Sequence, residues 1–177
     1  MRLPRHGYSL PELAAVLAVM GVLLALGLPS FMQLKNQMQT QAASHELSAS
    51  LVTARLNAVQ RGFPVSICPA DPLGRCREDG IWDTGWLVFL DEARARQPLD
   101  PGQILQHVMP AAGVRIRSVQ ARSLLRYLPD GRASGSNLTL RICSGDRRVE
   151  GRRIIVSNAG RPRMERMAPD HPECLGA

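Results

Sequence analysis

Several residue types and motifs are scarce or missing in this 177-residue sequence. Aromatic residues make up 4% of it, and Lys35 is the only lysine among 22 basic residues. No C-x-x-C pair and no glycine-rich phosphate loop occurs, and none of the four histidines stands in a recognisable motif with Ser, Cys or Asp. We therefore expect no metal, no cofactor and no enzymatic activity, although distant catalytic partners are invisible in a sequence.

Long hydrophobic runs are also scarce, since only one occurs, from Leu10 to Leu28. It has 19 residues and a single charge, Glu12. As a helix it would be roughly 28 Å long, which is enough to cross a hydrocarbon core. Arg2 and Arg5 precede it, which favours a cytoplasmic N-terminus and an exported body.

The order of the N-terminal parts differs from that of an ordinary secretory signal, in which the cleavage site follows the apolar region. Here the plausible processing point, between Gly7 and Tyr8, precedes it. Cleavage there would keep the helix and create an amine at Tyr8, four residues before Glu12. A carboxylate near a bilayer centre costs roughly 2.5–3.5 kcal/mol, so it usually has a partner. The simpler alternative is a signal anchor that tolerates Glu12 near the interface.

The residues that carry a family resemblance here are Gly7, Tyr8, Ser9, Leu10, Glu12 and Pro29. Together they resemble the type III signal of type IV pilins and pseudopilins. The resemblance implies cleavage after Gly7 and N-methylation of Tyr8 by a prepilin peptidase. It also implies that Glu12 pairs with the N-terminal amine of a neighbouring subunit during assembly. Pro29 matches the family's helix break, whereas Tyr8 stands where Phe is usual and Pro11 where an aliphatic residue is usual.

Four cysteines lie beyond the apolar run, and an even number in an exported body predicts two disulfides. Three connectivities are possible. We favour Cys68–Cys76, which closes a short loop, together with Cys143–Cys174, which attaches the C-terminal tail. A zinc site that uses His171 and Cys174 is the alternative, which the absence of a C-x-x-C pair disfavours.

The net charge of +7 is unevenly distributed. Residues 1–110 contain nine basic and nine acidic residues, whereas residues 111–177 contain thirteen arginines and six acids. The last third therefore carries the whole net charge, which suggests an anionic partner such as nucleic acid or membrane headgroups.

Helical periodicity continues from Ser30 to Arg61, and Gly62 and Pro64 end it. Its apolar stripe consists of Leu47, Leu51, Ala54 and Ala58, widened by Val52, Leu56 and Val59. We expect the stripe to pack on the globular body, with a partner-binding helix as the alternative.

Short strand patterns follow, at Pro64–Cys68, Gly85–Leu90, Ile104–Val108, Val114–Val119, Ser123–Leu128, Asn137–Cys143 and Arg152–Ser157. Trp82 and Trp86 are expected to anchor the core and the loops, with a ligand platform as the alternative. The fold class is therefore α+β, with one long N-terminal helix packed on an antiparallel β-sheet domain. The expected segments are a leader at 1–7, a transmembrane helix at 8–29, the periplasmic half of the helix at 30–62 and a β-rich domain with disulfides at 63–177.

The body contains the runs RGFPVSICPADPLGRC, DTGWLVFLDEA and LRYLPDGRASG, and it closes with IIVSNAGRPRMER. These runs resemble the FimT/GspH group of type IV minor pilins. Gly160-Arg161-Pro162-Arg163 matches the G-R-x-R motif of FimT-type pilins, which bind DNA during natural transformation. The resemblance thus implies a minor pilin, anchored in the inner membrane with its body in the periplasm, that joins a pilus with other major and minor pilins.

DNA binding is expected through Arg161 and Arg163, with an extension of the patch formed by Arg147, Arg148, Arg152, Arg153 and Arg166. No aromatic residues are interleaved with these arginines, so we expect phosphate contacts to double-stranded DNA without strong sequence preference. Two alternatives stay open. The surface is either a solvated arginine-rich face or a protein contact, as in the GspH-type minor pseudopilins of type II secretion systems.

Overall fold

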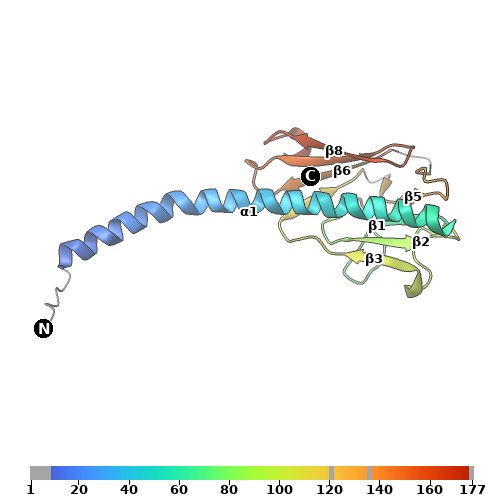
Figure 1. Cartoon of the computed structure of the whole chain (residues 1–177), viewed down its shortest axis with the longest axis horizontal. Helices are drawn as coiled ribbons and strands as arrows, with labels where there is room; N and C mark the ends of the chain where they lie inside the picture. The colour runs from blue at the N-terminus through green and yellow to red at the C-terminus, as the bar shows by residue number, and fades with distance from the viewer. Residues whose placement is uncertain (1–8, 120–121, 135–136, 176–177) are drawn as a thin grey trace, which may run out of the picture. The chain divides into compact units, whose positions relative to one another are not determined.

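The structure is a computed structural model that describes residues 9–119, 122–134 and 137–175 (Figure 1). The helix α1 (Leu10–Arg61) is 52 residues long. The chain divides into two compact units between Lys35 and Asn36, so α1 contributes to both. The helix continues through Pro29 without interruption, and the expected break is therefore absent. A proline inside a helix removes one hydrogen bond, which the neighbouring turns can compensate.

The described residues of the N-terminal unit include the apolar part of α1. Among the described residues, α1 is the helix that is long and apolar enough to cross a membrane. None of its apolar stretch is buried in the structure. Leu17, Leu24 and Phe31 are each more than half exposed. A surface of this kind needs an apolar environment, which agrees with the expected membrane span.

The second part of α1 packs on the globular body through a narrow stripe. Leu47, Leu51, Ala54 and Ala58 are fully buried, as predicted. The predicted widening of this stripe is wrong, because Val52, Leu56 and Val59 are exposed by 51%, 52% and 50%. Successive residues in a helix are about 100° apart, so residues adjacent in sequence to the buried stripe lie on other faces of α1.

The first sheet has four antiparallel strands in the order β3-β2-β1-β5. They are β1 (Val65–Pro69), β2 (Trp86–Leu90), β3 (Ile104–Val108) and β5 (Leu125–Tyr127). A short 3-10 helix, η1 (Pro101–Gln103), precedes β3.

The second sheet is also antiparallel, with the order β4-β6-β7-β8. Its strands are β4 (Val114–Arg117), β6 (Leu138–Ser144), β7 (Gly151–Val156) and β8 (Pro162–Met167). Each of the seven predicted strands overlaps an observed one, and β8 was missed. It begins with a proline and carries charged residues because it is an edge strand, with one neighbour instead of two.

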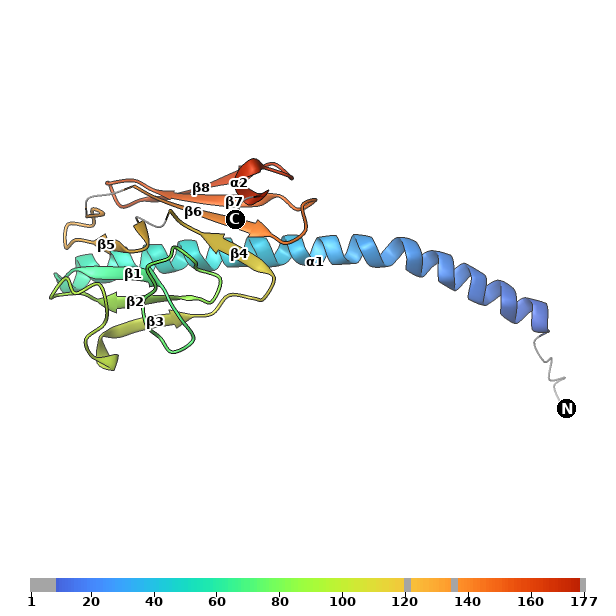
Figure 2. The same cartoon turned by 180° about the vertical axis from the view of Figure 1, so that it is seen from behind.

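The core lies between α1 and one face of each sheet, so α1 is in front of the strands in Figure 1 and behind them in Figure 2. Alternate residues of the strands point into it, among them Ile67, Val88, Ile116 and Ile154. Trp82 and Trp86 are fully buried, as expected. These contacts confirm the α+β class.

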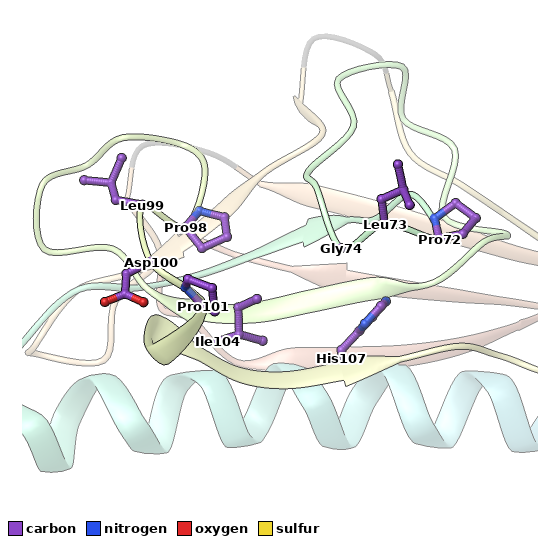
Figure 3. Close-up of a pocket in the computed structure, with 9 residues that line it drawn as sticks. All are labelled: Pro72, Leu73, Gly74, Pro98, Leu99, Asp100, Pro101, Ile104 and His107. Carbon is purple, nitrogen blue, oxygen red and sulfur yellow. The ribbon is translucent and has the colours of Figure 1, made fainter.

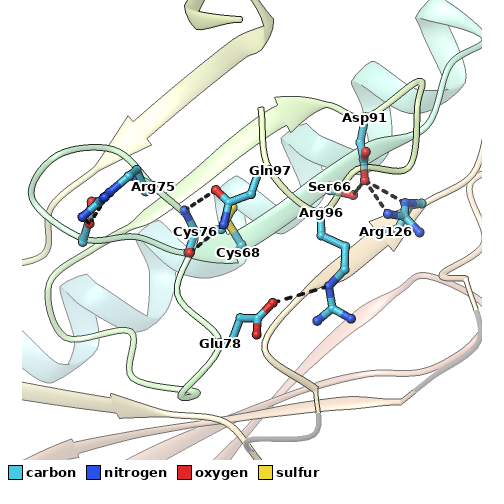
Figure 4. The surroundings of a disulfide bond; sticks show 10 residues. Ser66, Cys68, Arg75, Cys76, Glu78, Asp91, Arg96, Gln97 and Arg126 are labelled. Carbon is cyan, nitrogen blue, oxygen red and sulfur yellow. Dashed lines mark hydrogen bonds and ion pairs between the residues drawn. A yellow bond between two sulfur atoms is a disulfide. The ribbon is translucent and has the colours of Figure 1, made fainter. Parts of the chain in front are cut away.

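Two loops cover the other face of the first sheet, and the Cys68–Cys76 disulfide attaches one of them to β1 (Figure 4). The side-chain amide of Gln97, from the second loop, accepts a hydrogen bond from the backbone N–H of Cys76 at 2.9 Å. It also donates one to the Cys76 carbonyl at 2.8 Å. One residue thus joins the two covering loops.

A buried ion pair secures the same face. The Asp91 side chain is 1% exposed, and its carboxylate accepts hydrogen bonds from Ser66 Oγ at 2.6 Å and Arg126 Nε at 2.8 Å (Figure 4). Ser66 and Arg126 lie opposite each other on β1 and β5. The charges therefore join the loop after β2 to two strands.

The second disulfide, Cys143–Cys174, connects β6 to the short helix α2 (Pro172–Leu175). The structure therefore contains both of the pairings that the sequence favoured. In this arrangement Cys174 offers no thiolate to a metal, so the zinc alternative with His171 loses one of its two ligands.

Candidate nucleic-acid interface

The G-R-P-R motif begins in the turn between β7 and β8 and continues into β8, and its first residue is tightly constrained. Gly160 has φ +74°, and a Cβ there would lie 2.1 Å from the Gly131 carbonyl oxygen. That oxygen also accepts a hydrogen bond from Arg55 Nε of α1 at 2.9 Å. Ala133 N–H donates to the Asn158 carbonyl at 3.0 Å. Only glycine fits this close approach, which holds the turn against its neighbour.

Arg161 and Arg163 extend from this turn into solvent. Arg161 is exposed and makes no hydrogen bond or ion pair with any residue that the structure describes. The Arg163 side chain is 70% exposed and pairs with Glu165 at 2.9 Å. Because β8 is extended from Pro162 onward, residues two apart share a face, which places Arg163 and Glu165 together.

Glu165 also connects Arg163 to β7. Its carboxylate accepts hydrogen bonds from Arg153, with Nη2 at 2.7 Å, and Arg153 lies directly opposite it in the sheet. The Arg153 hydrogen bond, with a smaller contribution from Arg163, lowers the pKa of the Glu165 carboxyl. Arg153 further pairs with Glu173 of α2 at 3.6 Å. Arg153 therefore belongs to the same surface as Arg163, partly neutralised.

Arg152 does not belong to this surface, and its assignment to the DNA patch was wrong. It is 9% exposed, and its Nε is buried without a hydrogen-bond partner in the described structure. Adjacent strand residues point to opposite faces, so Arg152 and Arg153 cannot both face outward. Arg166 lies opposite Arg152 on β8, on the face away from Arg163, although it is exposed.

Arg147 and Arg148 are exposed, but they lie in the turn between β6 and β7. This turn is at the opposite end of β7 from Gly160, about 20 Å away for six extended residues. Arg148 is paired with Asp146 at 2.9 Å, and this hydrogen bond lowers the pKa of the Asp146 carboxyl. Neither arginine is therefore contiguous with the G-R-P-R turn.

One exposed arginine near the motif was not identified from the sequence. Arg132 follows Gly131, whose carbonyl touches Gly160, and its side chain is 70% exposed. It is paired with Asp130 at 2.7 Å. The sequence shows a turn at Pro129-Asp130-Gly131, but its contact with the turn at Gly160 depends on the tertiary fold.

The predicted processing residues Gly7 and Tyr8 lie outside the described residues. Glu12 is exposed in the first turn of α1, and its Oε2 accepts a hydrogen bond from Ser9 N–H at 3.4 Å.

A groove of about 380 Å³ lies on the first sheet, away from the arginine-rich turn (Figure 3). It is lined by Pro72, Leu73, Gly74, Pro98, Leu99, Asp100, Pro101, Ile104 and His107. Asp100 and His107 lie at opposite ends of it in Figure 3. Among the residues that the structure describes, no three His, Cys, Asp or Glu side chains gather to hold a metal ion.

An apolar helix of membrane-spanning length that continues into a core of two antiparallel sheets is the architecture of pilin-like proteins. The family model for the type II transport protein GspH matches residues 43–160. The chain therefore belongs to the GspH family and is a type IV minor pilin or pseudopilin of the GspH/FimT group.

Individual relatives agree with this assignment. The pilin-like protein PilA1 of Thermus thermophilus is 30% identical over 169 residues, covering 91% of this chain and 99% of the relative. The minor pilin FimU of Pseudomonas aeruginosa aligns with a TM-score of 0.56 and 24% identity, over 73% of this chain and 90% of FimU. The minor pseudopilin EpsH of Vibrio cholerae aligns with a TM-score of 0.51 and 11% identity, over 75% of this chain and 99% of EpsH. These two structures support the fold alone.

The matched family region ends at Gly160, so Arg161 and Arg163 lie just outside it. Their role therefore has to be argued from their own geometry and charge.

Proposed function

We propose that this minor pilin joins a type IV pilus and binds double-stranded DNA through Arg161 and Arg163 for uptake in natural transformation. One observation carries the proposal. Arg161 is exposed and unpaired among the described residues, on a turn that Gly160 fixes against Gly131, with the exposed Arg163 beside it. An exposed, unneutralised guanidinium on a constrained backbone turn is suited to bind phosphate.

The chemistry of this surface favours phosphate contacts over base contacts. Arginines bind phosphate oxygens in any sequence, whereas recognition of unpaired bases needs aromatic side chains for stacking. Both tryptophans are fully buried and belong to the core. Binding should therefore be strongly salt-dependent and nearly independent of DNA sequence.

The same proposal extends to anchoring and assembly. The apolar part of α1 would hold the protein in the inner membrane, with the N-terminus in the cytoplasm and the body in the periplasm. Prepilin peptidase would cut between Gly7 and Tyr8 and methylate the new amine. Glu12 would then pair with the N-terminal amine of a neighbouring pilin, which offsets the cost of a carboxylate in lipid.

DNA binding is tested by titrating the full-length protein in neutral detergent with duplex DNA at two salt concentrations. The Arg161→Gln/Arg163→Gln variant should bind more weakly, and its slope of log affinity against log salt should flatten by up to about 1.8, or 0.9 for each lost phosphate contact. The matched control is Arg94→Gln/Arg96→Gln, which removes the same charge from an exposed loop after β2. Equal slopes for the wild type and the first variant would exclude this motif as the DNA site.

A GspH-type minor pseudopilin of a type II secretion system is the second candidate, because the matching family model describes that protein. It predicts little DNA binding at moderate salt. It also predicts that Arg161→Gln/Arg163→Gln impairs secretion of a substrate protein and leaves transformation unchanged.

A further inference from the structure

The face of the second sheet that points away from α1 carries arginines on adjacent strands. Arg117 of β4 lies opposite Arg141 of β6, and Arg141 lies opposite Arg153 of β7. These strands lie side by side in Figure 2. We call Arg117, Arg141 and Arg153 the arginine row, which spans two strand spacings, or about 10 Å.

The alternation of side chains shows that this row is on the outer face. The residues that precede or follow it along each strand, Ile116, Leu140 and Ile154, are fully buried in the core. Side chains alternate between the two faces of a strand. The three members of the row are each partly exposed.

Carboxylates neutralise the two ends of the row but not its centre. Arg117 forms an ion pair with Asp83, and Arg153 pairs with Glu165 and Glu173. Arg141 forms no hydrogen bond or ion pair with any described residue, and its Nε is buried without a partner.

Like charges directly opposite each other on adjacent strands destabilise a sheet, and a buried N–H without an acceptor adds to that cost. An anion bound by the exposed part of the Arg141 guanidinium would offset the first of these costs, the repulsion between like charges. The fold thus maintains an arrangement that an external phosphate or carboxylate would stabilise.

The row is continuous with the G-R-P-R turn. Arg163 and Arg153 hold the same Glu165 carboxylate, at 2.9 and 2.7 Å, and therefore face the same side of the sheet. From β8 to β4 the surface extends over three strand spacings, about 14 Å. Duplex DNA carries one charge for about every 1.7 Å of its axis, so a surface of this length faces several phosphates.

We propose that bound DNA crosses the outer face of the second sheet and that Arg141 is its central phosphate contact. This inference rests on the proposed DNA-binding function and adds a contact distant in sequence from the G-R-P-R motif. Arg117 and Arg153 are held by their carboxylates, so the unneutralised positive charge of the row is that of Arg141.

The test compares Arg141→Gln with the wild type and with Arg94→Gln, an exposed arginine near the first sheet that removes the same charge. Full-length proteins in neutral detergent are titrated with duplex DNA over a range of salt concentrations. One lost phosphate contact should weaken binding about eightfold at 0.1 M salt and flatten the log–log salt slope by about 0.9. Arg94→Gln should leave the slope unchanged, and Arg141→Lys should largely retain it, because the charge remains.

Chemical protection provides a second measurement that needs no variant. Phenylglyoxal modifies arginines, and peptide mapping reports the extent at each position. Duplex DNA should protect Arg141 of the wild type and leave Arg94 unprotected.

The outcomes separate this inference from the proposed function. If Arg161→Gln/Arg163→Gln flattens the salt slope while Arg141→Gln does not, and Arg141 is unprotected, DNA binding stands and the contact at the row is refuted. If the wild type binds no DNA, the proposed function itself fails. If Arg141→Gln binds DNA normally but enters pili poorly, the row instead faces a carboxylate of a neighbouring subunit, which also overturns the inference.

Discussion

In the first sheet, two loops cover most of the face turned away from α1, whereas the same face of the second sheet carries partly exposed arginines. The opposite face of each sheet, which is turned towards α1, packs in the core. The outer face of the first sheet contains Leu87, Phe89 and the Cys68–Cys76 disulfide. A fold with two similar sheets can therefore use one as a closed support and the other as a contact surface.

Two carboxylates illustrate the difference. Asp91, in the loop after β2 of the first sheet, and Glu165, on β8 of the second, each accept hydrogen bonds from an arginine side chain. The Asp91 side chain is 1% exposed and Glu165 is 31% exposed. Because Asp91 is buried, its ion pair should be essential for stability. Water screens the ion pair of Glu165, which should therefore affect ligand binding more than stability.

The largest effect is expected from Asp91→Ala. It would leave the Arg126 guanidinium, 16% exposed, without its carboxylate, and removal of one partner of a buried pair costs about 3–5 kcal/mol. Thermal or denaturant unfolding measures this cost. The control is Asp130→Ala, which breaks an exposed pair with Arg132 and should change stability far less. Equal losses for the two variants would contradict the view that burial distinguishes the two faces.

An intermediate effect is expected from Gly160→Ala. The left-handed backbone, at φ +74°, and the 2.1 Å approach to Gly131 together should cost about 2–4 kcal/mol. Gly113→Ala is the matched control, since Gly113 has φ +93° but open space around it, and should cost about 1–2 kcal/mol. Gly160→Ala should also weaken DNA binding, because it displaces Arg161. Unfolding curves that coincide for the two variants would show that the contact with Gly131 is unimportant.

The smallest change in stability is expected from Glu165→Gln. Because the pKa of this carboxyl is lowered in the folded protein, it stabilises the fold above its ordinary pKa of 4.5 and loses this effect as the pH falls through the folded value. The variant should lack this part of the acid sensitivity. It should also bind DNA more tightly and with a steeper salt slope, because Arg163 loses its carboxylate partner and Arg153 keeps only Glu173. Weaker binding would show that Glu165 positions these arginines rather than neutralising them.

The sequence predicted the helix, seven strands and the buried tryptophans because each depends on local periodicity. It did not reveal β8, since Pro162 and the charges of this strand disguise an edge strand as a loop. The exposure of Val52 and Leu56 was also missed, because the buried stripe of α1 includes only some of the apolar residues of the helix.

The arginines show a different limit. Arg147, Arg148 and Arg152 are near the motif in sequence, yet the hairpin places them at the far end of β7 or in the interior. Arg132 and Arg141 approach the motif only through tertiary contacts and strand register. Spacing along the chain indicates which residues share a strand face, but strand pairing decides which strands are neighbours.

The Cys143–Cys174 disulfide has a mechanical consequence. It encloses β7, β8 and most of α2 in a covalent loop with a sequence separation of 31 residues. A load applied to a ligand held at Arg161 would pull on β8, an edge strand that is joined to the sheet on one side only. If β8 were pulled from β7, only chain inside the loop could extend, and the tension would then pass through the sulfur–sulfur bond into β6. The disulfide thus attaches β8 to the sheet at a second point, so that a pulling force on Arg161 would be carried by β6 inside the sheet.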